Sequence, residues 1–85
     1  MVVKVFWQER CPNCPQAKAL GERLEEEGLQ VEYWDVKMVS GLSEAILHDV
    51  MSTPSVVLVD ENEQELAAWR STTPSYHEVR KFLVD

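Results

Sequence analysis

The chain has 85 residues, enough for one small domain, and 45% of them are hydrophobic, an ordinary share that supports a core without a structural disulfide. The formal net charge is −7 at pH 7, which argues against nucleic acids and anionic membrane surfaces as partners. No apolar stretch approaches the roughly 20 residues of a membrane-spanning helix, so we expect no membrane partner.

The first two elements predicted along the chain are a strand and a helix. Residues Val2 to Trp7 are β-branched, aromatic and almost continuously apolar, which is typical of a strand buried on both faces. A helix is expected to follow Cys11 and to run to Glu27, where Gly28 ends it. The apolar residues of this helix recur every three or four positions and form one inward stripe, made of Ala17, Leu20, Gly21 and Leu24.

The next segment predicts an edge strand and a short helix. Apolar and polar side chains alternate from Gln30 to Val36, as they do in a strand with one exposed face. A loop is expected over Lys37 to Gly41, followed by a helix over Leu42 to Val50. The inward face of this helix is expected to hold Leu42, Ala45, Ile46 and Val50.

A hairpin is predicted in the third part of the chain. Val56 to Val59 are continuously apolar and predict a buried strand, and Glu65 to Trp69 predict a second, shorter strand. Only the polar turn from Asp60 to Gln64 separates them, so the two strands are expected to pair in antiparallel fashion.

The last helix is expected to start with Thr73 as the N-cap and Pro74 at the first helical position. Ser75 and Glu78, two residues later, have the spacing of a rival capping box. The apolar face of this helix is expected to comprise Tyr76, Val79, Phe82 and Leu83.

Together these elements predict an α/β fold with the order β-α-β-α-β-β-α. The helix between the first two strands implies a right-handed β-α-β unit, and the hairpin adds an antiparallel pair. We therefore expect a four-stranded mixed sheet with helices on both faces, forming a single domain over residues 1–85. Sites in such sheets form at the carboxyl ends of the strands, where the first strand leads into Cys11-Pro12-Asn13-Cys14.

The only two cysteines of the chain, Cys11 and Cys14, form a C-x-x-C motif around Pro12 and Asn13. Two thiols one helical turn apart can close a small disulfide and reopen it by thiol exchange. Pro12 suits the first helical position, which makes Cys11 the expected N-cap, where the helix dipole stabilises a thiolate. Pro15 is then expected at the fourth helical position, where it distorts the first turn.

The expected roles of the two thiols follow from their positions. Cys11 attacks a partner disulfide, and Cys14, which lies inside the first turn, resolves the mixed disulfide. The dithiol itself carries two electrons, so no cofactor and no metal are expected. The alternative is a metal site, but zinc takes four ligands, and the candidates His48 and His77 lie far apart and are expected at the surface. An iron–sulfur cluster that two subunits share through Cys11 is one form of this alternative.

The start of the chain lacks the basic and apolar pattern of a secretory signal, so we expect a reducing cytoplasm. In that compartment a lone cysteine pair is catalytic or metal-binding more often than structural.

Over essentially its whole length, the chain resembles thioredoxin-fold redoxins. The resemblance rests on Cys11-Pro12-Asn13-Cys14 after the first strand, on Thr53-Pro54 before the hairpin, and on the order of the elements. The motif Cys-Pro-x-Cys and the short length are similar to glutaredoxins. The activity that the resemblance implies is that of a thiol-disulfide oxidoreductase, an electron carrier that reduces a target protein.

The resemblance also implies a substrate groove. Thr53-Pro54 would be a cis peptide bond packed against the cysteine pair, leaving the Thr53 backbone free to pair with an extended substrate segment. The groove would be framed by residues 7–10, 52–54 and 70–73. The substrate-binding residues implied in this way are Trp7, Arg10, Pro12, Asn13, Thr53, Pro54 and Arg70.

One departure from glutaredoxins concerns the reductant. Glutaredoxins that use glutathione carry Gly-Gly followed by Asp after the last strand, whereas residues 69–74 here contain neither a glycine pair nor an acid. The resemblance therefore favours redoxins that are recharged by a thioredoxin reductase. Glutathione stays as the alternative, with Arg70 and the start of the last helix holding its carboxylate. The expected partners are this upstream reductant and a disulfide-bearing target protein, and the chain is expected to be a monomer.

Overall fold

The structure is a computed structural model and describes residues 1–83. Its elements follow the predicted order: β1 (Val2–Trp7), α1 (Cys14–Glu26), β2 (Gln30–Asp35), α2 (Val39–Leu47), β3 (Ser55–Val59), β4 (Glu65–Trp69) and α3 (Tyr76–Arg80). No helix within the described residues is both long and apolar enough to cross a membrane.

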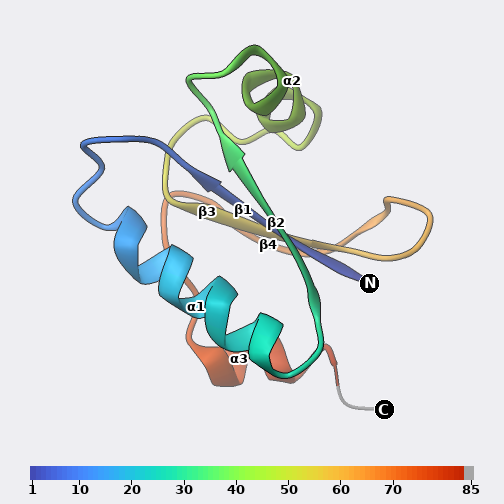
Figure 1. The fold of residues 1–85 in the computed structure, drawn as a ribbon. Helices are drawn as coiled ribbons and strands as arrows, with labels where there is room; N and C mark the ends of the chain where they lie inside the picture. The colour runs from blue at the N-terminus through green and yellow to red at the C-terminus, as the bar shows by residue number, and fades with distance from the viewer. Residues whose placement is uncertain (84–85) are drawn as a thin grey trace.

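The four strands form one mixed sheet in the order β2-β1-β3-β4. Strand β1 pairs in parallel with β2 and in antiparallel fashion with β3, and β3 pairs with β4 as the predicted hairpin. Helix α2 covers one face of the sheet, while α1 and α3 lie together on the other face (Figure 1). The predicted α/β class, the mixed sheet with helices on both faces and the edge position of β2 are therefore confirmed.

Two hydrophobic clusters lie on opposite faces of the sheet because side chains alternate along each strand. Val3 and Val5 of β1 pack with the buried stripe of α1 and with Val79 of α3. Phe6 of β1 packs with Ala45 of α2 in the other cluster. The predicted stripe of α1 is confirmed, since Ala17, Leu20, Gly21 and Leu24 are all buried.

Helix α1 begins at Cys14, so the expectation that Cys11 caps the helix and Pro12 opens it is wrong. The N-cap is Asn13, and Pro15 follows Cys14 at the very start of the helix, where its missing N–H would have no helical partner anyway. A start at Pro12 would have placed Pro15 where it removes a helical hydrogen bond and crowds the Cys11 carbonyl. The chain avoids this cost with a turn, closed by the Cys14 N–H, which donates to the Cys11 carbonyl at 3.2 Å.

Helix α2 is shifted and rotated relative to the prediction. It starts at Val39 and ends at Leu47, and its inward ridge contains Gly41 and Ala45. Leu42 and Ile46, which were expected to face inward, are exposed. The reason is a close approach, because a Cβ on Gly41 would lie 1.9 Å from the Asp35 carbonyl oxygen. The helix turns its only glycine toward β2 and so directs its larger apolar residues outward.

Of two other helix boundaries, the end of α1 follows its expected signal and the start of α3 follows the rival one. Gly28, at a φ of +88°, follows the end of α1. Of the two candidate starts for α3, the capping box is the one observed: Ser75 is the N-cap, its hydroxyl accepts from the Glu78 N–H, and the Glu78 carboxylate accepts from the Ser75 N–H. The expected start with Thr73 as the N-cap and Pro74 at the first helical position is therefore wrong, and Pro74 precedes the helix.

The Gly41→Ala variant is expected to lose about 3 kcal/mol of unfolding free energy, because the added methyl group meets backbone atoms that cannot move aside without separating α2 from β2. Urea denaturation measures this loss. The matched control is Ser43→Ala, an exposed position of the same helix, which should change the unfolding free energy by less than about 0.5 kcal/mol. Equal stability of the two variants would show that α2 does not depend on this contact.

Candidate active site

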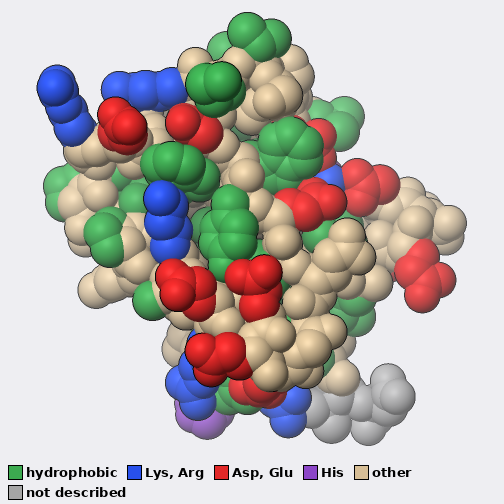
Figure 2. Space-filling model, in the orientation of Figure 1, with side chains coloured by type: hydrophobic (Ala, Val, Ile, Leu, Met, Phe, Trp, Pro, Cys, Tyr) green, Lys and Arg blue, Asp and Glu red, His purple; other side chains and the backbone are tan. Residues whose placement is uncertain are grey.

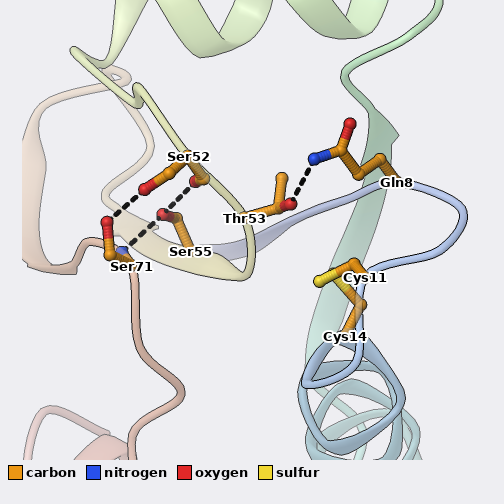
Figure 3. Close-up of a disulfide and its surroundings, with 7 residues drawn as sticks. All are labelled: Gln8, Cys11, Cys14, Ser52, Thr53, Ser55 and Ser71. Atoms are coloured by element: carbon orange, nitrogen blue, oxygen red, sulfur yellow. Dashed lines mark hydrogen bonds between the residues drawn. A yellow bond between two sulfur atoms is a disulfide. The ribbon is translucent and has the colours of Figure 1, made fainter.

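Cys11 and Cys14 form a disulfide between the end of β1 and the start of α1. Their Cα atoms are 5.3 Å apart, held by the turn through Pro12 and Asn13. Cys14 is buried, with 2% of its surface exposed, whereas Cys11 is half-buried and Pro12 and Asn13 are exposed. Cys11 is therefore the more accessible of the two cysteines, and Figure 3 shows both where the turn leads into α1.

A hollow beside the disulfide is formed by the end of β1, the following loop and the first turns of α1. Its lining comprises Trp7, Gln8, Glu9, Arg10, Cys11, Cys14, Pro15 and Lys18. The Lys18 ammonium lies 3.3 Å from the centroid of the Trp7 ring, which fixes the half-buried indole at the rim by a cation–π contact. Arg10 is exposed and has a φ of +60°, the left-handed conformation, immediately before Cys11.

The Thr53-Pro54 peptide bond is cis, as the resemblance implied. Two sets of hydrogen bonds hold its loop, and both are drawn in Figure 3. On the side of β1, the Gln8 side-chain amide donates to the Thr53 hydroxyl at 2.9 Å. On the side of β4, the Ser71 N–H donates to the Ser55 hydroxyl at 2.9 Å, and that hydroxyl donates to the Ser52 carbonyl at 2.8 Å. The hydroxyl groups of Ser52 and Ser71 also bond to each other.

A second hollow, which is polar, lies beside Pro54. Its lining comes from the active-site turn, the cis-proline loop and the segment after β4, and comprises Asn13, Gln16, Pro54, Ser71, Thr72 and Thr73. Of the three segments that the resemblance placed around a groove, residues 52–54 and 70–73 contribute to this hollow, whereas residues 7–10 line the hollow beside the disulfide. Within the described residues, the buried Thr73 hydroxyl has no hydrogen-bond partner.

Arg70 occupies a different environment from the other residues expected to bind substrate. Its guanidinium donates to the His48 carbonyl at 2.7 Å and the Asp49 carbonyl at 3.2 Å, both at the end of α2, and to the Glu65 carboxylate at 2.8 Å. These bonds join the end of β4 to the end of α2 and direct the guanidinium toward protein groups.

Sequence reasoning missed the hydrogen bonds that hold the cis-proline loop. Gln8 was placed in the groove only as part of a range, and Ser55 was not considered. Glutamine and serine are common at surfaces, and their partners are distant in the chain, so no local signal marks them.

A buried polar cluster lies under α2, on the face of the sheet opposite α1. Lys4 of β1 is only 1% exposed, and its ammonium donates to the carboxylates of Glu44 and Glu63 and to the Nε2 atom of His48 at 3.2 Å. His48 is 7% exposed, so the expectation that it lies at the surface is wrong. Its ring turns inward because it supplies an acceptor to the buried lysine.

The same cluster is where the described residues could hold a metal ion. Ligand atoms of Glu44, His48 and Glu63 lie within 4.8 Å of one another. The Lys4 ammonium bonds to all three side chains, so the positive charge that these groups require is already supplied by the chain itself. This cluster therefore neutralises a buried lysine.

The fold and the site define a class, the thioredoxin-fold proteins that carry a redox-active disulfide in a C-x-x-C motif. A family model described as a thioredoxin domain matches residues 1–83. The chain therefore belongs to the thioredoxin family, and its Cys11–Cys14 disulfide supports a thiol–disulfide redox function.

Solved structures of thioredoxins share this fold. Thioredoxin-2 of the malaria parasite, a component of its protein secretion machinery, superposes with a TM-score of 0.79 at 20% identity, over 96% of this chain and 79% of that one. Thioredoxin 1 from Thermosipho africanus gives 0.69 at 21% identity, over 98% and 94%. The germline-specific thioredoxin Deadhead of Drosophila melanogaster gives 0.72 at 21% identity, over 96% and 76%. A search of curated proteins by sequence found no significant match.

The Lys4 cluster predicts a loss of stability at alkaline pH. Burial disfavours the charged ammonium, but the hydrogen bonds and charges of Glu44 and Glu63 outweigh burial and raise the pKa of Lys4 above 10.5. Because the pKa of Lys4 is higher in the folded protein than in the unfolded chain, the charged ammonium stabilises the fold fully at pH values below the unfolded pKa. This stabilisation is lost as the pH rises through the pKa of Lys4 in the folded protein. The unfolding free energy should therefore fall above about pH 10.5.

Urea denaturation from pH 8 to pH 12 tests this expectation on the wild type and on Lys4→Met. The decrease in unfolding free energy at alkaline pH should be smaller in Lys4→Met, where the titrating ammonium is absent. Part of the decrease should remain, because burial and the hydrogen bond to Glu25 raise the pKa of Tyr33, which titrates with the same sign. Identical pH profiles in both proteins would contradict the role given to Lys4.

Proposed function

We propose that this protein is a protein-disulfide oxidoreductase that reduces a disulfide in a target protein. The observation that carries the proposal is the position of the Cys11–Cys14 disulfide, whose first cysteine is partly exposed and whose second is buried directly beneath it. In this arrangement a sulfur atom of the partner can reach Cys11, and Cys14 lies close enough to re-form the disulfide with Cys11.

The reaction balances as two thiol exchanges. The Cys11 thiolate attacks one sulfur of the target disulfide, which forms the mixed disulfide and releases the other target sulfur as a thiolate that takes up a proton. The Cys14 thiolate, formed by loss of its proton to solvent, then attacks the Cys11 sulfur and closes the Cys11–Cys14 disulfide. The second target thiolate leaves and is protonated, so two electrons have passed from this chain to the target.

We further propose that the target lies as an extended segment over the cis-proline loop. The Thr53 side chain is held by Gln8, which leaves the loop backbone to pair with the target strand. Contacts on either side would come from Trp7 and Arg10 at the rim and from Pro12 and Asn13 of the exposed turn, with the cis-proline Pro54 beneath the segment. Arg70 would contribute to this site by holding the loop end of β4, because its guanidinium is engaged by the carbonyls of His48 and Asp49.

The proposed reductant is a thioredoxin reductase, acting on a monomer in a reducing cytoplasm. Glutathione is the alternative. In the hollow beside Pro54, the segment Ser71 to Thr73 stands where glutathione-dependent glutaredoxins carry a glycine pair. The Arg70 guanidinium, which would be needed for a glutathione carboxylate, already bonds to the Glu65 carboxylate.

The Cys14→Ser variant is expected to accumulate a mixed disulfide through Cys11, because the resolving thiol is absent. Insulin, whose two chains are joined by disulfide bonds, serves as the substrate, and mass spectrometry of the acid-quenched mixture identifies the adduct. The matched variant, Cys11→Ser, should form at least tenfold less adduct, since the remaining Cys14 thiol is buried. If Cys11→Ser traps the substrate as well as Cys14→Ser does, the assignment of the two roles is wrong.

Reduction of the oxidised protein by two coupled systems tests the reductant. NADPH is supplied with a thioredoxin reductase in one reaction, and with glutathione and glutathione reductase in the other, and NADPH consumption is followed. Turnover that is at least tenfold faster with thioredoxin reductase is the expected result. Faster turnover with glutathione would replace the proposed reductant and leave the disulfide chemistry in place.

A further inference from the structure

Resolution of the mixed disulfide requires Cys14 to give up a proton inside the protein. Cys14 is only 2% exposed, and burial disfavours a charged thiolate. Within residues 1–83 the buried polar or charged residues are Lys4, His48 and Ser55, so none of them is a carboxylate that could take up the proton. The proton therefore goes to solvent, and the negative charge left on Cys14 needs stabilisation from groups that are not fully buried.

The start of α1 supplies only part of this stabilisation. The N–H of Cys14 donates to the Cys11 carbonyl, and Pro15 has no N–H, so these two positions offer no hydrogen-bond donor to the Cys14 sulfur. The first turn of α1 contains no acidic residue and does not oppose a negative charge. In Figure 2 the acidic side chains over α1 gather at its later turns, away from its start.

Lys18 follows Cys14 by one turn on the same side of α1. Residues four positions apart are neighbours on a helix surface, with Cβ atoms about 5–6 Å apart. Long side chains on a helix lean toward its N-terminus, so the Lys18 side chain leans toward Cys14. Both residues line the hollow beside the disulfide. The spacing and the shared hollow place a positive charge beside the thiol that has to ionise.

The Trp7 ring holds the Lys18 ammonium in place. The ammonium lies 3.3 Å from the centroid of the ring, and a lysine on its flexible stem would otherwise move freely in water. Trp7 ends β1, the strand from which the chain leads to Cys11. The cation–π contact thus joins the first turns of α1 to the end of β1 and keeps the charge at the site.

Two other charged residues, Glu9 and Arg10, line the same hollow. Both are exposed, have opposite signs and are adjacent in the chain, so their fields largely cancel and water screens them. The polar hollow beside Pro54 has no charged residue in its lining. Lys18, which is half-buried, therefore supplies the unbalanced positive charge in the two hollows that adjoin the active-site turn.

We propose that Lys18 stabilises the thiolate of Cys14 and so speeds the step in which Cys14 resolves the mixed disulfide. This inference rests on the proposed disulfide exchange and adds a residue to its second step. Lys18 is a positioning residue, because it acts through the charge of Cys14. A nearby positive charge raises the fraction of Cys14 that is ionised at neutral pH. A stabilised thiolate is also a weaker nucleophile, which offsets part of the gain.

The test separates the two thiol exchanges with dithiodipyridine, a small uncharged disulfide. Cys11 of the reduced protein attacks one sulfur of the reagent and releases the first thiopyridone. Cys14 then attacks the Cys11 sulfur, closes the Cys11–Cys14 disulfide and releases the second thiopyridone. Stopped-flow absorbance follows both releases at reagent concentrations where the first is the faster. The rate constant of the second release measures resolution, because an intramolecular step does not depend on reagent concentration.

Lys18→Met is expected to slow the second release about threefold between pH 6 and pH 8, and to change the first release by less than about twofold. The difference should decline toward about pH 10, where more Cys14 is ionised in both proteins without the help of Lys18. Lys18→Arg keeps a cation that can lie over Trp7, so its second release should stay within about twofold of the wild type.

The matched control is Lys81→Met, which removes the same charge from the end of α3. Lys81 is exposed and lines the hollow beside Phe82, away from the one that contains Cys14. Both releases should keep their wild-type rate constants. Slowing of the second release by Lys81→Met as large as that by Lys18→Met would assign the effect to net charge and overturn the role of Lys18.

Other results would also decide against the inference. Equal rate constants for the second release in the wild type and Lys18→Met would remove Lys18 from the step and leave the proposed function standing. Equal slowing of both releases would show that Lys18 does not act specifically on Cys14. Equal slowing by Lys18→Met and Lys18→Arg at every pH would show a structural role without dependence on charge. Absence of a second release in the wild type would reject the resolving role of Cys14, and with it the proposed function.

Discussion

Strand β1 is paired on both edges and covered on both faces, and the remaining elements are placed around it. Its neighbours β2 and β3 take up its backbone hydrogen bonds, and its alternating side chains divide the core into two clusters. Since a strand in this position cannot reach water, the ammonium of Lys4 must find its partners inside the protein. The chain leaves β1 at its carboxyl end and then reaches Cys11, where the active-site turn begins.

The need to neutralise Lys4 also explains how α2 is oriented. Glu44 and His48 face inward to meet the ammonium, and Gly41 on the same side permits close contact with β2. The helix cannot bury these residues and its largest apolar side chains at once, because they lie on different sides of its axis. The exposure of Leu42 and Ile46 is thus the consequence of a polar contact in the core, and Leu42 lines a hollow together with Thr53, which precedes the cis-proline.

Most helix and strand signals with a local cause predicted the structure, but the expected starts of α1 at Cys11 and of α3 at Thr73 were wrong. The capping box of Ser75 and Glu78 and the hydrophobic stripe of α1 involve neighbours in the chain, so they are readable from the sequence. The apolar spacing of Leu42 and Ile46 predicted an inward face for α2 that the structure contradicts. The apolar pattern implies that Leu42 and Ile46 face the core, but it carries no information about the contact of Glu44 with Lys4, which lies forty positions earlier in the chain.

The sequence by itself determined the order of the elements, the position of the two thiols after a buried strand and the presence of Thr53-Pro54 before the hairpin. Periodicity and motif spacing are properties of adjacent residues, so they need no tertiary information. Only the tertiary structure decided that Gln8 and Ser55 hold the cis-proline loop, and which side of α2 faces the sheet. Each of these depends on steric and hydrogen-bonding partners that the three-dimensional fold selects, most of them distant along the chain.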